Sequence, residues 1–185
     1  MGGILILGGA RSGKSSFAEN LAKSFSDQVL YVATAIPFDE GMKDRIRKHQ
    51  ESRPPQWNTV ELYSEFQLIQ TLDKFKTSEV VLLDCITVMV TNLMLDQAVD
   101  YDQVTHEELD KIESKIFIEL EMLLKVLDSS GKQYILVSNE VGLGLVPPYK
   151  LGNYFRDIAG RVNQRIAAFV GDVYFVVSGI PMKIK

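Results

Sequence analysis

The chain has 185 residues, the length of one ordinary domain, which is long enough to bury a hydrophobic core without disulfides. Hydrophobic residues make up 46% of the chain and charged residues 24%, and these proportions exclude a disordered or fibrous protein. The formal net charge is −4, from 20 Lys and Arg against 24 Asp and Glu, so the chain lacks the basic balance of a general nucleic-acid binder.

Cysteine and hydropathy patterns indicate the compartment. The single cysteine, Cys85, excludes an intramolecular disulfide and fits a reducing environment. No run free of charged residues exceeds 11 residues, whereas a membrane helix needs about 18. Arg11 and Lys14 follow the apolar start too closely for a signal peptide. We therefore expect one cytoplasmic domain over residues 1–185, with no membrane span and no nucleic-acid partner.

Short apolar runs alternate with longer amphipathic stretches along the chain. The clearest helical pattern covers residues 109–127, and Gly131 ends it. Apolar runs predict strands at residues 4–7, 29–33, 80–83, 134–137 and 173–177. This alternation predicts a P-loop (RecA-like) α/β fold, in which a mainly parallel sheet of about five strands carries helices on both faces. Residues 180–185 are expected to return as an antiparallel edge strand.

Three segments interrupt this pattern. Residues 36–58 contain a charged helical stretch, and Pro54 and Pro55 require that helix to have ended. Residues 97–106 are polar and acidic, as in a surface connection. Residues 141–152 contain three glycines and two prolines directly after a strand. Loops at the carboxyl ends of parallel strands form the ligand crevice of such sheets, which gives the last segment functional interest.

A phosphate-binding motif follows the first predicted strand. It fits the pattern G-x-x-x-x-G-K-[S/T] completely and precedes an amphipathic helix, with Phe17, Leu21 and Phe25 expected on its inner face. Glycines let successive N–H groups point at phosphate oxygens, and the helix dipole favours the same anion. In this pattern Lys14 reaches the β- and γ-phosphates and the Ser15 hydroxyl ligates Mg²⁺. The nucleotide-binding residues of the loop are Gly8, Gly9, Ala10, Arg11, Ser12, Gly13, Lys14 and Ser15.

Asp84 follows the predicted strand at residues 80–83. A carboxylate there is the Walker-B arrangement, which holds Mg²⁺ directly or through water, although an aspartate in this place can also cap the next helix. Trp57, Tyr63 and Phe66 could stack on a guanine or corrin ring, but core packing is the simpler account.

The two histidines differ in their surroundings. His106 lies among acidic residues at a helix start and is expected to be exposed. His49 ends a basic stretch, and nearby cations lower the pKa of an imidazole and keep it neutral and nucleophilic. From the pattern alone, an exposed basic helix with an inactive histidine is the simpler interpretation of His49.

The chain resembles the bifunctional cobinamide kinase/cobinamide-phosphate guanylyltransferases of adenosylcobalamin biosynthesis almost from end to end. The P-loop occurs in many unrelated proteins, whereas its combination with residues 139–142 and 155–164 is specific to this family. Further matching stretches lie at residues 31–35, 45–54, 57–61, 84–92 and 177–179.

This resemblance implies an enzyme with two activities. Such an enzyme phosphorylates adenosylcobinamide with ATP or GTP, and then transfers GMP from GTP to adenosylcobinamide phosphate through a histidine–GMP intermediate. The resemblance implies Mg²⁺ as cofactor, a homotrimer, Lys14 and His49 as catalytic residues, and Ser15 and Asp84 as metal ligands. It also implies guanine-nucleotide contacts from Ala33, Thr34, Ala35, Gln50, Glu51, Ser52, Arg53, Glu61 and Asp84.

Two departures from the family pattern and two rival functions accompany this interpretation. Some relatives have histidine where this chain has Lys48, which points more firmly to His49 here, and many have glutamate where it has Asp84. The rival functions are a small-molecule kinase without guanylyl transfer and a nucleotide-dependent ATPase switch.

Overall fold

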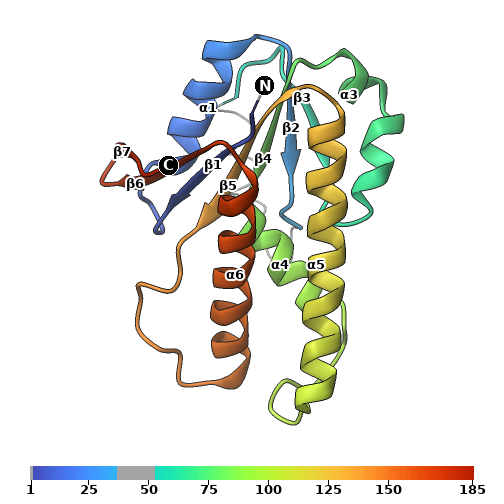
Figure 1. The fold of residues 1–185 in the computed structure, drawn as a ribbon, viewed down its shortest axis with the longest axis vertical. Coiled ribbons are helices and arrows are strands. Elements are labelled where there is room, and N and C mark those ends of the chain that lie inside the picture. Colours follow the sequence, from blue (N-terminus) through green and yellow to red (C-terminus); the bar gives the residue numbers. More distant parts are fainter. Residues whose placement is uncertain (1, 37–52) are drawn as a thin grey trace.

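The computed structural model describes residues 2–36 and 53–185, and its elements are labelled in Figure 1. Within these ranges the chain forms one seven-stranded sheet in the order β3-β2-β4-β5-β1-β6-β7. Each neighbouring pair of strands is parallel except β6 and β7, which are antiparallel. The strands are β1 (Ile4–Gly8), β2 (Val29–Ala33), β3 (Asn58–Glu61), β4 (Val80–Asp84), β5 (Gln133–Asn139), β6 (Asp172–Val177) and β7 (Ile180–Lys183).

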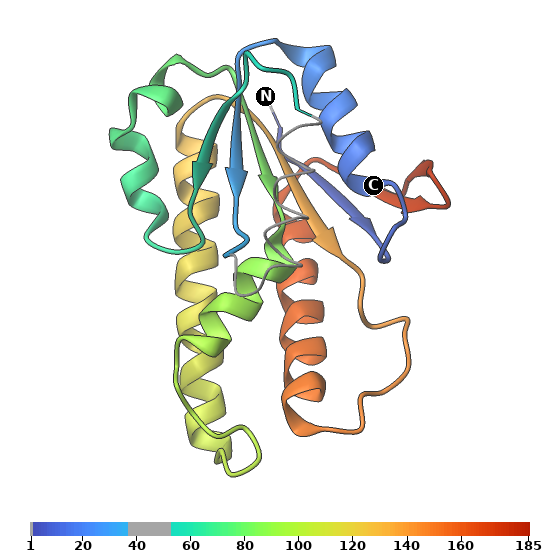
Figure 2. The same ribbon diagram turned by 180° about the vertical axis from the view of Figure 1, so that it is seen from behind.

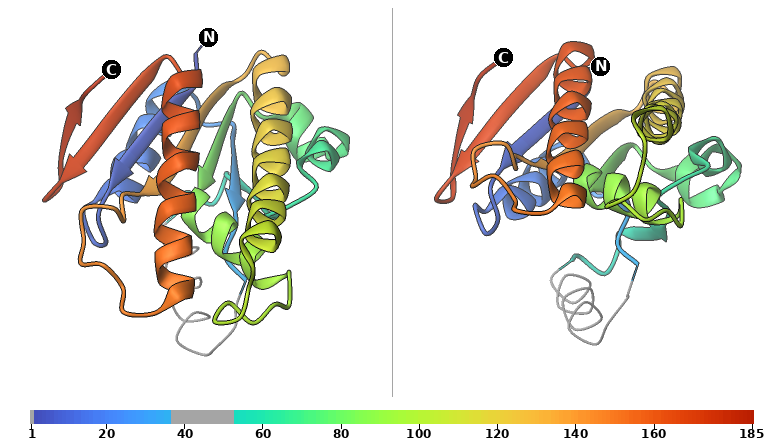
Figure 3. Two further views of the ribbon diagram at one scale, coloured as in Figure 1. Left: turned by 60° about the horizontal axis from the view of Figure 1, so that its bottom comes forward. Right: turned by 90° about the horizontal axis from the view of Figure 1, so that it is seen from below.

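Helices cover both faces of the sheet, as predicted. Helix α1 lies on one face, and α5 and α6 run along the other, which the front and back views show clearly (Figures 1 and 2). Helix α4 contacts α5, α6 and the neighbouring strand β5, and it lies between the two long helices (Figure 3). The helices are α1 (Lys14–Phe25), the 3₁₀ helix η1 (Phe66–Thr71), α3 (Asp73–Thr77), α4 (Ile86–Leu95), α5 (His106–Ser129) and α6 (Lys150–Phe169).

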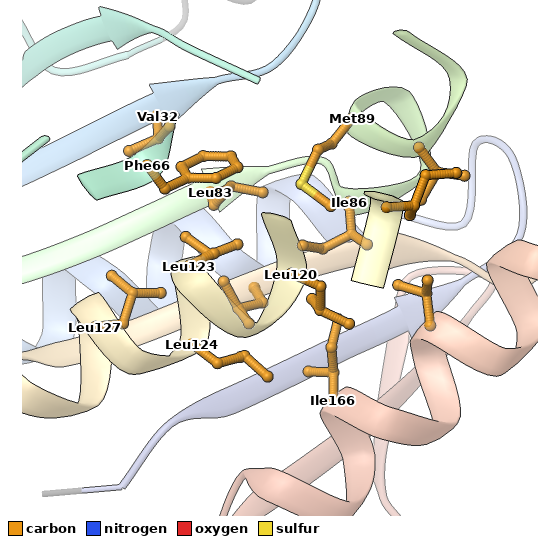
Figure 4. Close-up of a cluster of buried hydrophobic side chains, with 14 of the residues drawn as sticks. Val32, Phe66, Leu83, Ile86, Met89, Leu120, Leu123, Leu124, Leu127 and Ile166 are labelled. Atoms are coloured by element: carbon orange, nitrogen blue, oxygen red, sulfur yellow. The ribbon is translucent and has the colours of Figure 1, made fainter. Parts of the chain in front are cut away.

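Burial on both faces explains why the central strands read as continuous apolar runs. Alternate residues of β1 enter two separate cores: Leu5 and Leu7 pack on the side of α5 and α6, whereas Ile4 and Ile6 pack on the side of α1. Figure 4 shows the larger core, where leucines of α5 point toward side chains of β2 and β4. Leu120, at its centre, is fully buried.

Two details differ from the sequence-based expectations. The sheet of the described residues has six parallel strands rather than about five, because β3 was not predicted. Phe17 and Leu21 pack against the core on the α1 side, as expected, next to the buried Ala18 and Ala22. Phe25 is 48% exposed, so its expected inward position was wrong. Alanines let the helix approach the sheet closely, and Phe25 falls at the end of the helix, beyond that contact.

The C-terminal segment follows the expectation closely. Ser178 and Gly179 form a turn with φ values of 51° and 80°, and β7 returns antiparallel to β6. Across the described part of the chain, none of the helices combines the length and apolar character that crossing a lipid bilayer requires.

Candidate functional site

The carboxyl ends of the parallel strands meet at one edge of the sheet and bring distant residues together. In sheet order this edge presents Glu61 of β3, Ala33 of β2, Asp84 of β4, Asn139 of β5 and Gly8 of β1. Ala33 pairs with both Glu61 and Asp84, and Asn139 pairs with Gly8. Four of the five belong to the predicted nucleotide site, and this edge is where an open parallel sheet binds ligands.

The phosphate loop leaves β1 at this edge and ends where α1 begins. Gly13 is the N-cap of α1 and has a φ of 91°, a backbone conformation that glycine adopts without strain. Inside the loop, the Ser12 N–H donates to the Gly9 carbonyl over 3.3 Å. The sequence therefore folds as the motif requires, with a tight loop feeding directly into a helix N-terminus.

The turn between β6 and β7 braces the loop from outside. The Gly179 N–H donates to the Ser12 carbonyl over 2.8 Å. A Cβ added to Gly13 would lie 3.1 Å from the Gly179 Cα, so the two backbones are in close contact. The motif alone gave no sign of this brace, because it depends on a turn at the other end of the sequence.

Lys14 is turned toward the loop that precedes it. Its side chain is mostly buried, and Nζ donates to the Gly9 carbonyl over 3.2 Å. The Ser12 hydroxyl is buried and has no hydrogen-bond partner among the described residues. A buried polar group without a partner is costly, so this hydroxyl has unused hydrogen-bonding capacity within the loop.

Asp84 is the last residue of β4 and is half-buried. Its Oδ2 accepts a hydrogen bond from the Tyr31 hydroxyl over 3.0 Å. Burial raises the pKa of Tyr31 well above its ordinary value, and the Asp84 charge adds to this, so the phenol remains a donor at neutral pH. The alternative of helix capping by Asp84 is not observed, because Cys85 is the N-cap residue of α4 and, among the described residues, no side-chain cap hydrogen bond is formed there.

The polar groups of Thr34 are already used within the protein. Its hydroxyl donates to the Cys85 carbonyl over 2.8 Å and accepts from the Cys85 N–H over 3.0 Å. Its own carbonyl accepts from the Asn92 side chain over 2.7 Å. Thr34 thus ties the end of β2 to the turn after β4, and in this conformation it offers a nucleotide few free groups.

A network of hydrogen-bonded polar side chains lies between Asp84 and the phosphate loop. The Asn139 side-chain amide donates to the Thr87 hydroxyl over 2.6 Å, and that hydroxyl lies 3.2 Å from the Cys85 Sγ. Asn163 of α6 donates to the Asn139 carbonyl over 3.1 Å and accepts from the Ser138 hydroxyl. Asn139 was not among the predicted site residues, although residues 139–142 form one of the stretches that carry the family resemblance.

The remaining predicted contacts fall into two groups. Arg53 lies over the Tyr31 ring, with its guanidinium carbon 3.4 Å from the ring centroid, and Glu61 is exposed at the end of β3. Ala35 is half-buried just beyond β2. The predicted catalytic His49 and the predicted contacts Gln50, Glu51 and Ser52 lie outside the described residues.

Three further side chains are placed by the structure. Trp57 and Phe66 are buried in the two cores, which agrees with packing as the simpler account of these rings. His106 is exposed as the first residue of α5, as expected.

The oxygen groups at this edge suit a magnesium ion that is shared with a nucleotide. In the described ranges, no group of three or more His, Cys, Asp or Glu side chains gathers in a way that would hold a metal. Mg²⁺ needs no such cage, because it binds through one or two protein oxygens, phosphates and water. Asp84 uses one carboxylate oxygen for Tyr31, and the described residues give its other oxygen no hydrogen-bond partner. The oxygen ligands at this edge therefore fit Mg²⁺.

Together, the parallel sheet, the glycine loop before α1 and the carboxylate two strands away define a P-loop nucleotide-binding protein. Comparison with known proteins narrows this class. The chain belongs to the family described as cobinamide kinase / cobinamide phosphate guanyltransferase, whose pattern it matches over residues 4–184. The predicted family and fold are confirmed.

Curated relatives agree with this membership. The chain is 45% identical to the bifunctional adenosylcobalamin biosynthesis protein CobU of Escherichia coli K12, over 98% of this chain and 99% of that protein. It is 40% identical to the bifunctional adenosylcobalamin biosynthesis protein CobP of Pseudomonas aeruginosa, over 98% of this chain and 96% of that protein. Among solved structures, the flagellar accessory protein FlaH of Methanocaldococcus jannaschii aligns with 100% of this chain and 78% of that chain, at 16% identity and a TM-score of 0.48.

Proposed function

We propose that this chain catalyses both reactions of its family on one nucleotide site. The first transfers the γ-phosphoryl group of ATP or GTP to the aminopropanol hydroxyl of adenosylcobinamide. The second transfers GMP from GTP to the adenosylcobinamide phosphate, and pyrophosphate leaves. The observation that carries the proposal is the complete phosphate loop beside Asp84, in a chain that matches the family over residues 4–184.

Lys14 and the loop have the same task in both reactions. A bound triphosphate would replace the Gly9 carbonyl as the partner of the Lys14 ammonium, because a phosphate offers a full negative charge. Loop N–H groups and Ser12 would hold the phosphate oxygens at the N-terminus of α1. Ser15 and Asp84 would hold Mg²⁺, which neutralises the charge that develops on the phosphates.

His49 is the proposed nucleophile of the second reaction. Its neutral imidazole nitrogen attacks the α-phosphorus of GTP, the bond to the β-phosphate oxygen breaks, and pyrophosphate leaves. An oxygen of the substrate phosphate then attacks the same phosphorus, breaks the P–N bond and returns the imidazole. Support for His49 comes from the family pattern and from its basic neighbours in the sequence, which favour a neutral ring.

Labelling with GTP that is radioactive at its α-phosphate tests this proposal. The protein should retain label that is stable in alkali and lost in acid, as a phosphoramidate is, and GTP labelled at the γ-phosphate should leave none. His49→Ala should abolish both the labelling and guanylyl transfer and keep much of the kinase activity, and His106→Ala should change neither. A simple kinase or an ATPase switch would never hold α-label. Label retained by His49→Ala would refute the assigned nucleophile.

Lys14→Ala tests the shared site, because it should depress both activities together. Wild-type rates of either reaction in this variant would contradict one common phosphate site. We also propose a homotrimer, and a sedimentation mass equal to one chain would refute it.

A further inference from the structure

We infer that Tyr31 is a positioning residue that holds the Asp84 carboxylate in place for a divalent cation, a role that rests on the proposed function. The two residues come from neighbouring parallel strands, β2 and β4. The Tyr31 hydroxyl donates to Asp84 Oδ2 over 3.0 Å. This contact fixes the orientation of the carboxylate and leaves Oδ1 without a hydrogen-bond partner among the described residues.

Packing alone does not explain the Tyr31 hydroxyl. The strand reads Val29-Leu30-Tyr31-Val32-Ala33, and every residue in it is buried; Tyr31 is only 2% exposed. Phenylalanine would fill the same space without a polar atom, and a buried hydroxyl is costly unless it has a partner. Asp84 is that partner, so the hydroxyl serves the one side chain of β4 that is proposed to reach the cation.

Arg53 lies over the face of the Tyr31 ring. Its guanidinium carbon lies 3.4 Å from the ring centroid, within the range of a cation–π contact. Its Nη1 also donates to the Thr59 hydroxyl on β3 over 3.5 Å. The phenol is therefore held between a proposed nucleotide contact and the proposed metal ligand, and it has little freedom to swing away from Asp84.

Binding of Mn²⁺ in a nucleotide complex tests this inference without measuring activity. The nucleotide is a GTP analogue with a methylene group between the α- and β-phosphorus, which an attacking histidine cannot cleave there, and free Mn²⁺ is measured by electron paramagnetic resonance. Tyr31→Phe keeps the ring and removes only the hydroxyl. We expect its dissociation constant for Mn²⁺ to rise roughly three- to tenfold, the effect of losing one hydrogen bond to a carboxylate. Binding of the analogue without metal should stay unchanged.

Tyr134→Phe is the matched control. Tyr134 is also 2% exposed and lies on β5, but in the other core, and its hydroxyl makes no hydrogen bond within the described residues. Mn²⁺ affinity should be unaffected in this variant. Equal weakening in both variants, or wild-type affinity in Tyr31→Phe, would overturn the positioning role.

The wild-type protein offers a second measurement that needs no variant of the buried ring. A cation bound to Asp84 withdraws negative charge from the carboxylate that accepts the Tyr31 hydrogen bond. Addition of Mg²⁺ to the analogue complex should therefore change the near-ultraviolet absorption of tyrosine. The perturbation should be lost in Asp84→Asn; its absence from wild type would overturn the inference. A wild-type complex that binds no Mn²⁺ would refute the proposed metal site and this role together, whereas the α-label experiment tests His49 separately.

Discussion

Gly13→Ala tests whether the backbone of the phosphate loop is fixed by its φ angle and by its contact with Gly179. Alanine at a φ of 91° is strained, by about 1–2 kcal/mol for the left-handed conformation. The new Cβ would also lie 3.1 Å from the Gly179 Cα. Gly179 cannot move without disturbing its 2.8 Å hydrogen bond to Ser12. Together these effects should cost roughly 2–3 kcal/mol of unfolding free energy, with about 1 kcal/mol assigned to the close contact.

Differential scanning calorimetry measures this loss, because 1 kcal/mol lowers the Tm of a protein of this size by about 2–4 °C. We expect a Tm roughly 4–12 °C lower for Gly13→Ala. Gly9→Ala is the matched control, since a Cβ there meets no atom of the described residues within 4 Å and Gly9 is not among the glycines with a positive φ. Its Tm should move by less than about 2 °C. Equal stability of the two variants would refute the reasoning.

Three further predictions concern the core, the cysteine and a helix cap. Leu120→Ala should lower the free energy of unfolding in urea by about 3–5 kcal/mol, because Leu120 is fully buried. Ile118 is 63% exposed, so Ile118→Ala should change this free energy by less than about 0.5 kcal/mol. Similar losses in the two variants would contradict the core described. Burial, reinforced by the Asp84 charge, raises the pKa of the Cys85 thiol to about 11. At pH 8 a thiol reagent should therefore modify Cys85 about 100-fold more slowly in the native protein than after unfolding. Rapid modification of the native protein would contradict this prediction. Thr105→Ala should remove the capping box of α5 and cost about 1 kcal/mol. Hydrogen bonds from the Thr105 backbone N–H and from its hydroxyl hold the pKa of Glu108 below its usual range. Thr105→Ala loses only the hydroxyl bond, so the part of the stability difference that this bond contributes should disappear as the pH falls below about 4. A difference that stays constant in acid would contradict the cap.

The strands in the middle of the sheet could be predicted because each is buried on both faces and therefore reads as an apolar run. Strand β3 could not, since Asn58, Thr59 and Glu61 surround a single aliphatic residue, and only pairing with β2 makes this segment a strand. Hydrophobic spacing also suggested Phe25 as an inward residue of α1. The observed contact through Ala18 and Ala22 depends on how closely the helix approaches the sheet, which the sequence does not specify.

In the candidate site, the phosphate loop and Asp84 could be identified because each follows a predicted strand. The bond from Tyr31 to Asp84 and the bond from Asn139 to Thr87 could not, because both depend on strand order. Neither pair is close in sequence, and each meets only because β4 lies between β2 and β5. The role of His49 stays a prediction.

The brace between Ser12 and Gly179 has a consequence for the order in which the protein folds. Within the described residues, strand β1 pairs with β5 and β6 alone, and the ribosome synthesises both of these strands long after β1. Contacts between segments so distant in sequence form late, because closing the long intervening chain lowers its conformational entropy before these contacts can compensate. The strands β2, β3 and β4 are consecutive neighbours of one another in the sheet and can assemble earlier. A nascent chain should therefore acquire the observed conformation of its phosphate loop only after the β6–β7 hairpin has emerged.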